Sequence, residues 1–523
     1  MTASFVDPAS GQLRPGAPAA APLERLVDRA GDDPERLLAA LAAHGIAAAA
    51  VVELVARRAP AVAQTAVWRA AVARSREKGD RLRLAGERAE AALAGLGDRV
   101  ALPGSPLGPA WSSDIDVLVR SNALADAEAA LCAAGFLDVN PLLARLGRRT
   151  PGVRRFAAIA DGRVLGSVEL CLRLHDDGPR ADAAIAVAVA GAPGRLPRLA
   201  PADRALRRCG KIAAKRRVTV RDVLELAALR EEVGALPRAR AVRVAERRCR
   251  AVVEPDGGRR PPPVSPTWLQ ARVRSLRRQA RRTLRPNRML VAFTGIDGSG
   301  KSTQAELLTG SLLRTSIPAQ AVWARIGFSG SALVSRAARV GQRVLPAGSH
   351  SAQRARASGA ASAAAPLTRR GPIGWSWALA VTLDYLCIAR RAAHGPPGTV
   401  MVLDRALPDA LVDLEQGFGG ALDLRLQRWL IERWSPRPDL IFHLRLSGAA
   451  AHARKADLFS ADVLERYARR YEAVLAGPET VALDATRAAE DIARDALRVL
   501  AGAGPGGCAA GYDDPGRRDG FRH

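Results

Sequence analysis

The sequence predicts an α/β protein of two units: a C-terminal unit built on a doubly wound parallel sheet, and an N-terminal α+β unit with helical flanks. In the second half, a glycine-rich loop lies between an apolar run of strand length and a helical stretch, and strand and helix patterns then alternate. In the first half, an alanine-rich helical region gives way at Val100 to short apolar strands. That change of period predicts a second, separate unit.

The N-terminal elements follow in order from composition and spacing. Residues 1–22 hold Pro, Gly and Ala without periodicity and are expected to be disordered, whereas residues 23–236 carry helices and the first set of strands. A linker and a basic helix are expected over 237–287, because glycines, prolines and many arginines gather there. The predicted strands and helices are Val100–Leu102, Ser121–Phe136, Ile115–Val119, Val164–Leu174 and Pro201–Leu236.

The C-terminal unit is predicted to span residues 288–502. Its first strand and the glycine loop are followed by a helix with apolar residues at three- and four-residue spacing. Low complexity between Gly341 and Gly371 suggests a mobile insertion, and residues 503–523 are expected to form a flexible tail. The predicted strands are Met289–Phe293, Ala321–Ala324, Thr399–Leu403, Leu440–Leu446 and Thr480–Leu483.

Charge narrows the class of partner. The 523 residues carry a formal net charge of +27, which favours anionic partners such as nucleotides, nucleic acid or membrane phosphate. Coding bias toward arginine and alanine explains the same balance without a partner. Aromatic residues make up only 4% of the chain and do not interleave with basic runs, which argues against nucleic acid.

Compartment and assembly are inferred from what the chain lacks. The six cysteines form no C-x-x-C or Cys/His cluster, so neither a zinc site nor a disulfide framework is expected. The N-terminus lacks the apolar core of a signal peptide, and the most apolar helix candidate, Trp375–Ala389, is too short to span a bilayer. We therefore expect a cytoplasmic protein without a membrane span. We also keep a homodimer as a candidate assembly.

The glycine loop fits the pattern G-x-x-x-x-G-K-[ST] and lies between a strand and a helix, as a phosphate-binding loop requires. Its backbone N–H groups and the helix N-terminus supply positive field, Lys301 reaches the β- and γ-phosphates, and Ser302 can bind Mg²⁺. A chance glycine turn would need none of these flanks. The loop therefore predicts ATP and Mg²⁺ as cofactors, with the contacting residues Gly295, Asp297, Gly298, Ser299, Gly300, Lys301, Ser302 and Thr303.

Beyond this general motif, residues 293–304 closely resemble the opening of thymidylate kinases. Two later landmarks, Val402-Leu403-Asp404-Arg405 and the stretch from Pro438 to Leu444, resemble the Asp-Arg pair and the Pro-Asp-Leu strand entry of that family, in family order. The resemblance covers about Arg288–Leu500. It implies a kinase that transfers the γ-phosphoryl group of MgATP to a nucleoside monophosphate or a related phosphorylated acceptor.

The resemblance also implies a role for each charged residue. Asp404 would hold Mg²⁺, Arg405 and Arg325 would clamp the acceptor phosphate, and Arg454 or Lys455 would close over the transferring group. The competing interpretations are a surface ion pair for Asp404-Arg405 and solvated charges for the others.

Departures from the family lie on the acceptor side. Ala406 and Asp409 replace a Tyr and a Ser, Asp384-Tyr385 replaces an Asp-Arg pair, and no Glu-Pro-Gly-Gly follows Arg325. Specificity for thymidine monophosphate is therefore not implied. A kinase for a sugar or another small metabolite, and a non-enzymatic ATP-dependent switch, remain as alternatives.

A second resemblance lies in the first half. Gly104-Ser105 followed by Asp114-Ile115-Asp116 resembles the G-S…D-x-D pattern of the nucleotidyltransferase superfamily, over about residues 100–228. Alternate residues of a strand point to one face, so the two carboxylates can bind a divalent metal. The resemblance implies a third carboxylate on a neighbouring strand, for which Glu169 is the candidate. An exposed strand end or a degenerate site is the alternative.

Two lysines downstream of this motif are one helical turn apart. Lys211 and Lys215 either face a triphosphate or lie on a solvated helix face.

Overall fold

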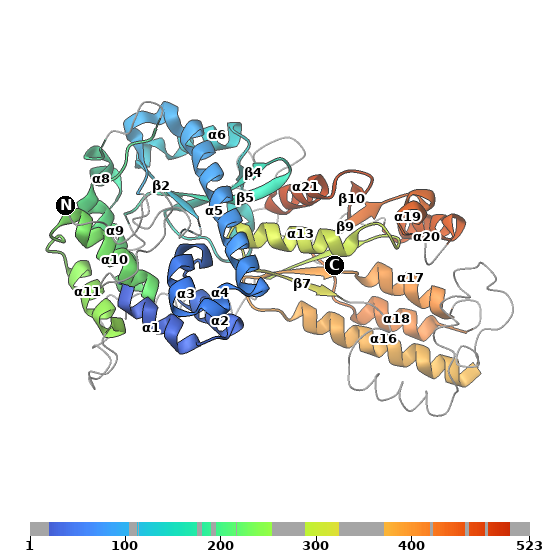
Figure 1. Cartoon of the computed structure of the whole chain (residues 1–523). Coiled ribbons are helices and arrows are strands. Elements are labelled where there is room, and N and C mark those ends of the chain that lie inside the picture. Colours follow the sequence, from blue (N-terminus) through green and yellow to red (C-terminus); the bar gives the residue numbers. More distant parts are fainter. Residues whose placement is uncertain are drawn as a thin grey trace.

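The structure is a computed structural model in which two five-stranded sheets lie at the centre of two packed units (Figure 1). It describes residues 20–103, 112, 114–174, 180–189, 195–215, 217–253, 288–323, 371–418, 422–455, 460–475 and 480–502. Several predicted features lie outside this described part: Gly104-Ser105, Arg325, the basic stretch before Arg288, the insertion before Gly371 and the tail after Gly502.

The chain begins with a bundle of helices that has its own core. Leu23, Leu54 and Trp68 are buried together, and Leu224 of a later helix joins them. Asp33 caps α2 by accepting hydrogen bonds from the backbone N–H groups that follow it. The first helix begins at Ala21, inside the segment expected to be disordered. The helices are α1 (Ala21–Ala30), α2 (Pro34–Ala43), α3 (Val52–Arg58), α4 (Pro60–Ala63) and α5 (Ala66–Leu93).

The first sheet is mixed, with strand order β1-β2-β5-β4-β3. Strands β2 and β5 pair in parallel, and the other neighbours pair antiparallel. Strands were predicted close to β1, β2 and β5, whereas β3 and β4 were missed. The elements are β1 (Val100–Ala101), β2 (Ile115–Val119), α6 (Leu124–Ala133), β3 (Leu137–Asp138), α7 (Asn140–Arg145), β4 (Val153–Ala160), β5 (Arg163–Cys171) and α8 (Asp182–Ala186).

Three helices complete the N-terminal unit: α9 (Pro201–Ala214), α10 (Val220–Val233) and α11 (Arg240–Val253). Residues 240–253, which lie in the segment expected to hold the linker and a basic helix, form α11, and this helix packs against α9 and α10. Val242, Ala245 and Cys249 are buried there at helical spacing. Arginines occupy the other faces of α11, so the apolar positions of this helix are not obvious in the sequence.

The second sheet contains five strands that all pair in parallel, in the order β10-β9-β6-β8-β7. Val291 and Phe293 of β6 pack with Leu308, whereas Leu290 and Ala292 face the opposite side with Ala393. The strands are β6 (Met289–Thr294), β7 (Ala319–Trp323), β8 (Val400–Asp404), β9 (Leu440–Arg445) and β10 (Thr480–Asp484). All five lie within about two residues of their predicted positions, and the α/β class is confirmed.

The helices of this unit connect the strands and continue past the last one. In chain order they are α13 (Lys301–Arg314), α16 (Gly371–Ala393), α17 (Leu407–Phe418), α18 (Arg425–Trp434), α19 (Gly448–Arg454), α20 (Ala461–Val474) and α21 (Ala489–Ala501). Helices α16, α17 and α18 lie side by side beyond the second sheet, with a core that includes Tyr385 and Ile431 (Figure 1).

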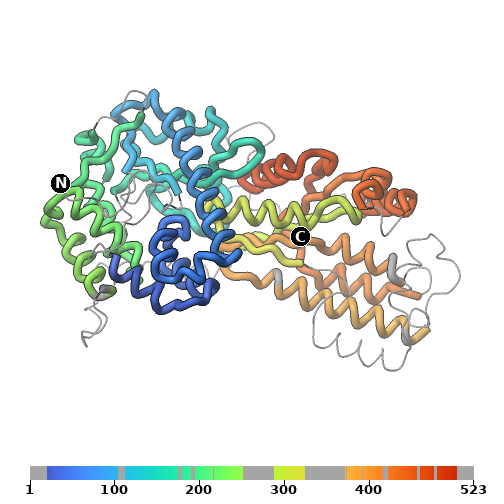
Figure 2. Tube along the Cα trace, in the orientation of Figure 1, coloured from blue at the N-terminus to red at the C-terminus, as the bar shows by residue number. Residues whose placement is uncertain are grey.

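The two units share one hydrophobic core. Leu142 and Leu146 of the first unit belong to the same buried cluster as Leu308 and Leu497 of the second. Figure 2 shows the cyan segment around β4 and β5 against α13 in yellow and α21 in red, and β5 contacts both helices. Arg163 and Glu490 add an ion pair of 2.8 Å across this boundary. The units are therefore packed as one body along this face.

Within the described residues, no single helix has the length and apolarity to cross a bilayer, although a bent pair, Pro34–Ala43 with Ala48–Arg58, passes by length and composition. Cys132 is disulfide-bonded, whereas Cys171, Cys209, Cys249 and Cys387 are free.

Candidate functional site

The loop between β6 and α13 needs its glycines for two reasons. Gly295, Gly298 and Gly300 have φ values of 149°, 85° and 91°, which side chains with a Cβ rarely adopt. A Cβ at Gly295 would lie 2.8 Å from the carbonyl oxygen of Leu444, and one at Gly298 would lie 3.0 Å from that of Ala451. The loop is therefore folded closely against the end of β9 and against α19, and α13 begins directly after it.

Lys301 is the first residue of α13, and its side chain is buried beneath the loop. Its Nζ donates hydrogen bonds to the carbonyl oxygens of Gly295 at 2.6 Å and Ile296 at 2.9 Å. Burial, and then the nearby charge of Arg405, lower its pKa. Within the described residues the ammonium group forms no ion pair, so its charge is available to an anion held by the loop.

Ser302 and Asp404 meet because β6 and β8 are neighbours. Phe293 pairs with Asp404 in the register of these strands, which brings the carboxylate beside the start of α13. The Ser302 hydroxyl donates to Asp404 Oδ2, and Asp404 Oδ1 is buried without a hydrogen-bond partner among the described residues. An unpartnered carboxylate oxygen beside a hydroxyl is a donor set that suits Mg²⁺. The residues therefore fit the predicted ion.

Arg405 has an unusual backbone conformation. Its φ of 89° is uncommon for a residue other than glycine, and its N–H donates to the carbonyl oxygen of Phe293 at 3.1 Å. The guanidinium lies 3.3 Å from Asp413 and 3.9 Å from Asp297 of the loop. Burial alone would lower its pKa, but the surrounding carboxylates raise it. Backbone strain of this kind is found where the fold must hold a side chain in one orientation. Asp404 and Arg405 are both buried, so the interpretation of this pair as a surface ion pair is wrong.

Of the two candidate lid cations, only Lys455 contacts the loop. Its Nζ is 3.3 Å from Asp297 Oδ2, whereas the Nη2 of Arg454 donates to the carbonyl oxygen of Ala485 at 2.8 Å. Burial would raise the pKa of Asp297, but Lys301, Lys455 and Arg405 together hold it below its ordinary value. Arg454 is thus placed beside the end of β10. The predicted roles of both cations stay predictions.

The structure explains one residue that departs from the thymidylate kinase pattern on the acceptor side, Asp409. Asp409 Oδ2 accepts from the N–H of Ala406 at 3.0 Å, which caps α17, and Oδ1 accepts from the hydroxyl of Tyr471 at 3.0 Å. The carboxylate is therefore used internally. Tyr471 and Asp413 were missed by sequence reasoning, although Asp413 lies one helical turn after Asp409 and so on the same face.

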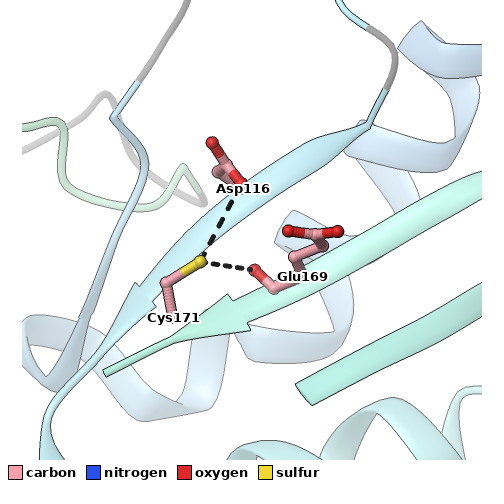
Figure 3. Close-up of side chains that lie close together, drawn as sticks. All are labelled: Asp116, Glu169 and Cys171. Atoms are coloured by element: carbon pink, nitrogen blue, oxygen red, sulfur yellow. Dashed lines mark hydrogen bonds between the residues drawn. The ribbon is translucent and has the colours of Figure 1, made fainter. Parts of the chain in front are cut away.

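A second constellation lies on the first sheet. Asp116 of β2 pairs with Glu169 of β5 in register, and Cys171 follows on the same face (Figure 3). One ligand atom from each of the three lies within 4.8 Å of the others, and the Cys171 thiol is 3.9 Å from Asp116 Oδ1. Asp114 precedes β2, and its charge acts on Glu169 and on Lys78 of α5. Sequence reasoning missed Cys171, whose only signal is its place two residues after Glu169.

Basic side chains already neutralise these carboxylates. Asp116 Oδ2 lies 2.6 Å from Arg207 and 2.7 Å from Lys211, and Arg155 Nε donates to Glu169 at 2.8 Å. Burial would raise the pKa of Asp116, but the two cations of α9 hold it far below its usual range. Burial is the main reason that the pKa of Glu169 is raised. A divalent ion at Asp116 would lie against two positive groups, so this arrangement does not fit the predicted metal.

Lys211 and Lys215 turn to different carboxylates. Lys211 binds Asp116, whereas Lys215 binds the fully buried Asp222 at 2.5 Å. The two side chains are 35% and 37% exposed, and each is engaged in an ion pair.

The comparisons with known proteins are sparse. No protein-family model and no curated protein matches the chain. Among solved structures, two of deoxyadenosine kinase from M. mycoides align, one with dCMP and a flexible dCDP as products and one with dATP. Each is 12% identical, covers 40% of this chain and 98% of that chain, and has a TM-score of 0.28 or 0.27. Similarity this low carries no inference about function.

Proposed function

We propose that the C-terminal unit transfers the γ-phosphoryl group of MgATP to a nucleoside monophosphate or a related small phosphorylated acceptor. One observation carries the proposal. The hydroxyl of Ser302 meets the buried carboxylate of Asp404 beside a glycine loop, and one oxygen of that carboxylate has no partner among the described residues.

The chemistry requires charge neutralisation and positioning more than a covalent catalyst. The loop N–H groups and the start of α13 bind the phosphates, and Lys301 neutralises the β- and γ-phosphate oxygens. When bound, Mg²⁺ supplies further neutralisation, and Ser302 and Asp404 would hold it. Arg405 is rigidly placed next to the loop, where it orients an incoming anionic acceptor.

Lys455 is the better candidate for closing over the transferring group. It lies against Asp297 of the loop, whereas Arg454 is bound to the carbonyl of Ala485. We propose that Lys455 exchanges Asp297 for the phosphoryl group as the acceptor binds. The acceptor itself stays open between a nucleotide, a sugar phosphate and another phosphorylated metabolite, because Asp409 is engaged internally.

The decisive experiment measures Mg²⁺-dependent transfer of labelled γ-phosphate across a panel of nucleoside monophosphates and sugar phosphates. Transfer to one acceptor, lost in Lys301→Ala and retained in Lys211→Ala, would support the kinase and name its substrate. The control removes a lysine of the first unit that has no place in the loop. Tight ATP binding without acceptor-dependent turnover across the panel would favour the nucleotide-dependent switch.

Nucleotidyl transfer by the N-terminal unit is a second candidate function. The register of Asp116 with Glu169 favours it, because two carboxylates then face one side of the sheet. The ion pairs of Asp116 with Arg207 and Lys211 argue against it. Replacing Asp114 and Asp116 with Asn tests the proposal: transfer of a nucleotide should disappear, and unchanged transfer would remove these residues from the reaction.

A further inference from the structure

Helix α18 exposes large apolar side chains that no described element covers, Leu426 and Trp429 on its outer face and Trp434 at its C-terminal end beside α16. Trp429 and Trp434 are 53% and 47% exposed, and Leu426 is 40% exposed. The helix is held by its opposite face, where Gln427 and Ile431 are buried. A large aromatic side chain is rarely left in water, so a cluster of this kind on a helix indicates a binding surface.

The exposed side chains of α18 adjoin α16 at Trp434. Leu426, Trp429 and Arg433 follow at three- and four-residue spacing and share one face of α18. At the margin of that face, the guanidinium of Arg390 stacks on the ring of Trp434, 4.8 Å from its centroid. We call this surface the tryptophan face, and it comprises Leu383 and Arg390 of α16 with Leu426, Trp429, Arg433 and Trp434 of α18.

The tryptophan face is strongly basic. Helix α18 carries three arginines and one glutamate, and α16 adds Arg390 and Arg391 in its last turn. Arg428 is paired with Glu415, but Arg391 and Arg433 have no ion pair within the described residues. A second copy of the chain would bring a like-charged surface against this one, which opposes self-association.

We propose that the tryptophan face docks on an anionic phospholipid bilayer. Tryptophan rings favour the boundary between headgroups and acyl chains, where the indole body is in an apolar environment and its N–H stays hydrated. Arginines around the rings contact lipid phosphates, and each basic residue near an anionic surface adds to the attraction. Helix α18 lies in the plane of the interface and does not span it.

The tryptophan face and the phosphate loop lie on different elements, because the loop packs against β9 and α19. The tryptophan face is on the α16–α18 side of the second sheet, whereas the first unit packs against α13 and α21 (Figure 1). The inference is independent of the proposed function, since it uses no residue of the loop.

The test is sedimentation of the full-length protein with sucrose-loaded vesicles of phosphatidylcholine alone or with phosphatidylglycerol. We expect binding only to the vesicles that contain phosphatidylglycerol. Trp429→Ala/Trp434→Ala should weaken this binding roughly tenfold or more, as should Arg390→Glu/Arg433→Glu. The matched control, Arg243→Glu/Arg247→Glu, removes the same charge from exposed positions of α11 and should bind as the wild type does.

Several outcomes would overturn the proposal. Among them are no binding to anionic vesicles, equal binding by the tryptophan variant, and equal weakening by the α11 control, which would mean unspecific attraction to a basic protein. Dimerisation that the tryptophan variant abolishes, without vesicle binding, would assign the face to a second copy. Unchanged ATP binding and thermal unfolding establish that each variant is folded. Trp429→Ala alone provides a milder substitution, because it leaves the stacking of Arg390 on Trp434 in place.

Discussion

At the scale of single residues, Arg405 combines a strained backbone with a side chain held beside the glycine loop. Its left-handed backbone costs about 1–3 kcal/mol for a residue with a Cβ, yet the chain places arginine there. The cost is offset by aiming the guanidinium at the loop and at Asp413. Glycine would hold the same backbone without strain but would lose the charge.

Arg405→Gly and Arg405→Ala should therefore differ in stability but not in activity. Both remove the guanidinium and should abolish the proposed phosphoryl transfer. The glycine variant should be more stable than the alanine variant by about 1 kcal/mol, because only alanine keeps the strain. Urea unfolding of the two variants checks this order. Equal stabilities would mean that residue 405 does not keep its positive φ in solution.

Asp409 illustrates a carboxylate that serves the fold. Asp409→Ala leaves the N–H of Ala406 and the hydroxyl of Tyr471 without their acceptor, and each buried donor costs about 1–3 kcal/mol. Tyr471→Phe removes only one hydrogen bond and should cost about 1 kcal/mol. Thermal unfolding should rank the two variants in that order, while ATP binding by Tyr471→Phe stays close to the wild-type value.

Asp116 makes stability depend on pH in a predictable direction. Arg207 and Lys211 hold its pKa far below the ordinary value of 3.8, so the folded state favours the ionised carboxylate. This contribution is fully present above that ordinary pKa and is lost as the pH falls below it. The difference in unfolding free energy between the wild type and Asp116→Asn should therefore shrink from pH 5 to pH 3. A constant difference would mean that the ion pairs contribute nothing.

At the scale of elements, α11 belongs to the N-terminal unit although its sequence is dominated by arginine. Ala245 is completely buried against α9 and α10, whereas Arg243 is exposed on the same helix. Ala245→Asp should destabilise the unit by several kcal/mol, since it buries an unpaired charge, and Arg243→Asp should change stability by about 0.5 kcal/mol at most. Chemical denaturation measures both changes. If residues 240–253 were a linker, neither variant would change the free energy of unfolding.

At the scale of the whole molecule, the shared core predicts that the two units unfold together. Leu146 comes from the first unit but packs in the cluster that holds Leu308 and Leu497. Leu146→Ala should cost about 2–5 kcal/mol and should lower the temperature at which ATP binding is lost. Calorimetry with and without ATP provides the measurement, because ligand binding stabilises every part that unfolds with the site. Loss of ATP binding at the wild-type temperature would mean that the units are independent.

The elements that sequence predicted well are those defined by local pattern. The strand, glycine loop and helix from Met289 to Arg314 were predicted from the spacing of apolar residues and from the backbone conformations that only glycine adopts easily. The buried parallel strands were recognised as apolar runs. Strand β4 was missed because it begins with Val153-Arg154-Arg155, which shows no alternating apolar pattern, and α11 was missed because arginines hide its apolar stripe.

The sequence by itself determined the glycine loop between β6 and α13 and the residue types that the proposed phosphoryl transfer needs, since both depend on short-range backbone geometry and charge. Only the tertiary structure decided which side chains meet. Strand register brings Asp404 to Ser302 and Glu169 to Asp116, and helix packing brings Arg207 and Lys211 onto the latter carboxylate. Contacts between distant segments depend on the order of strands in a sheet and on the packing of its faces, which no local pattern specifies.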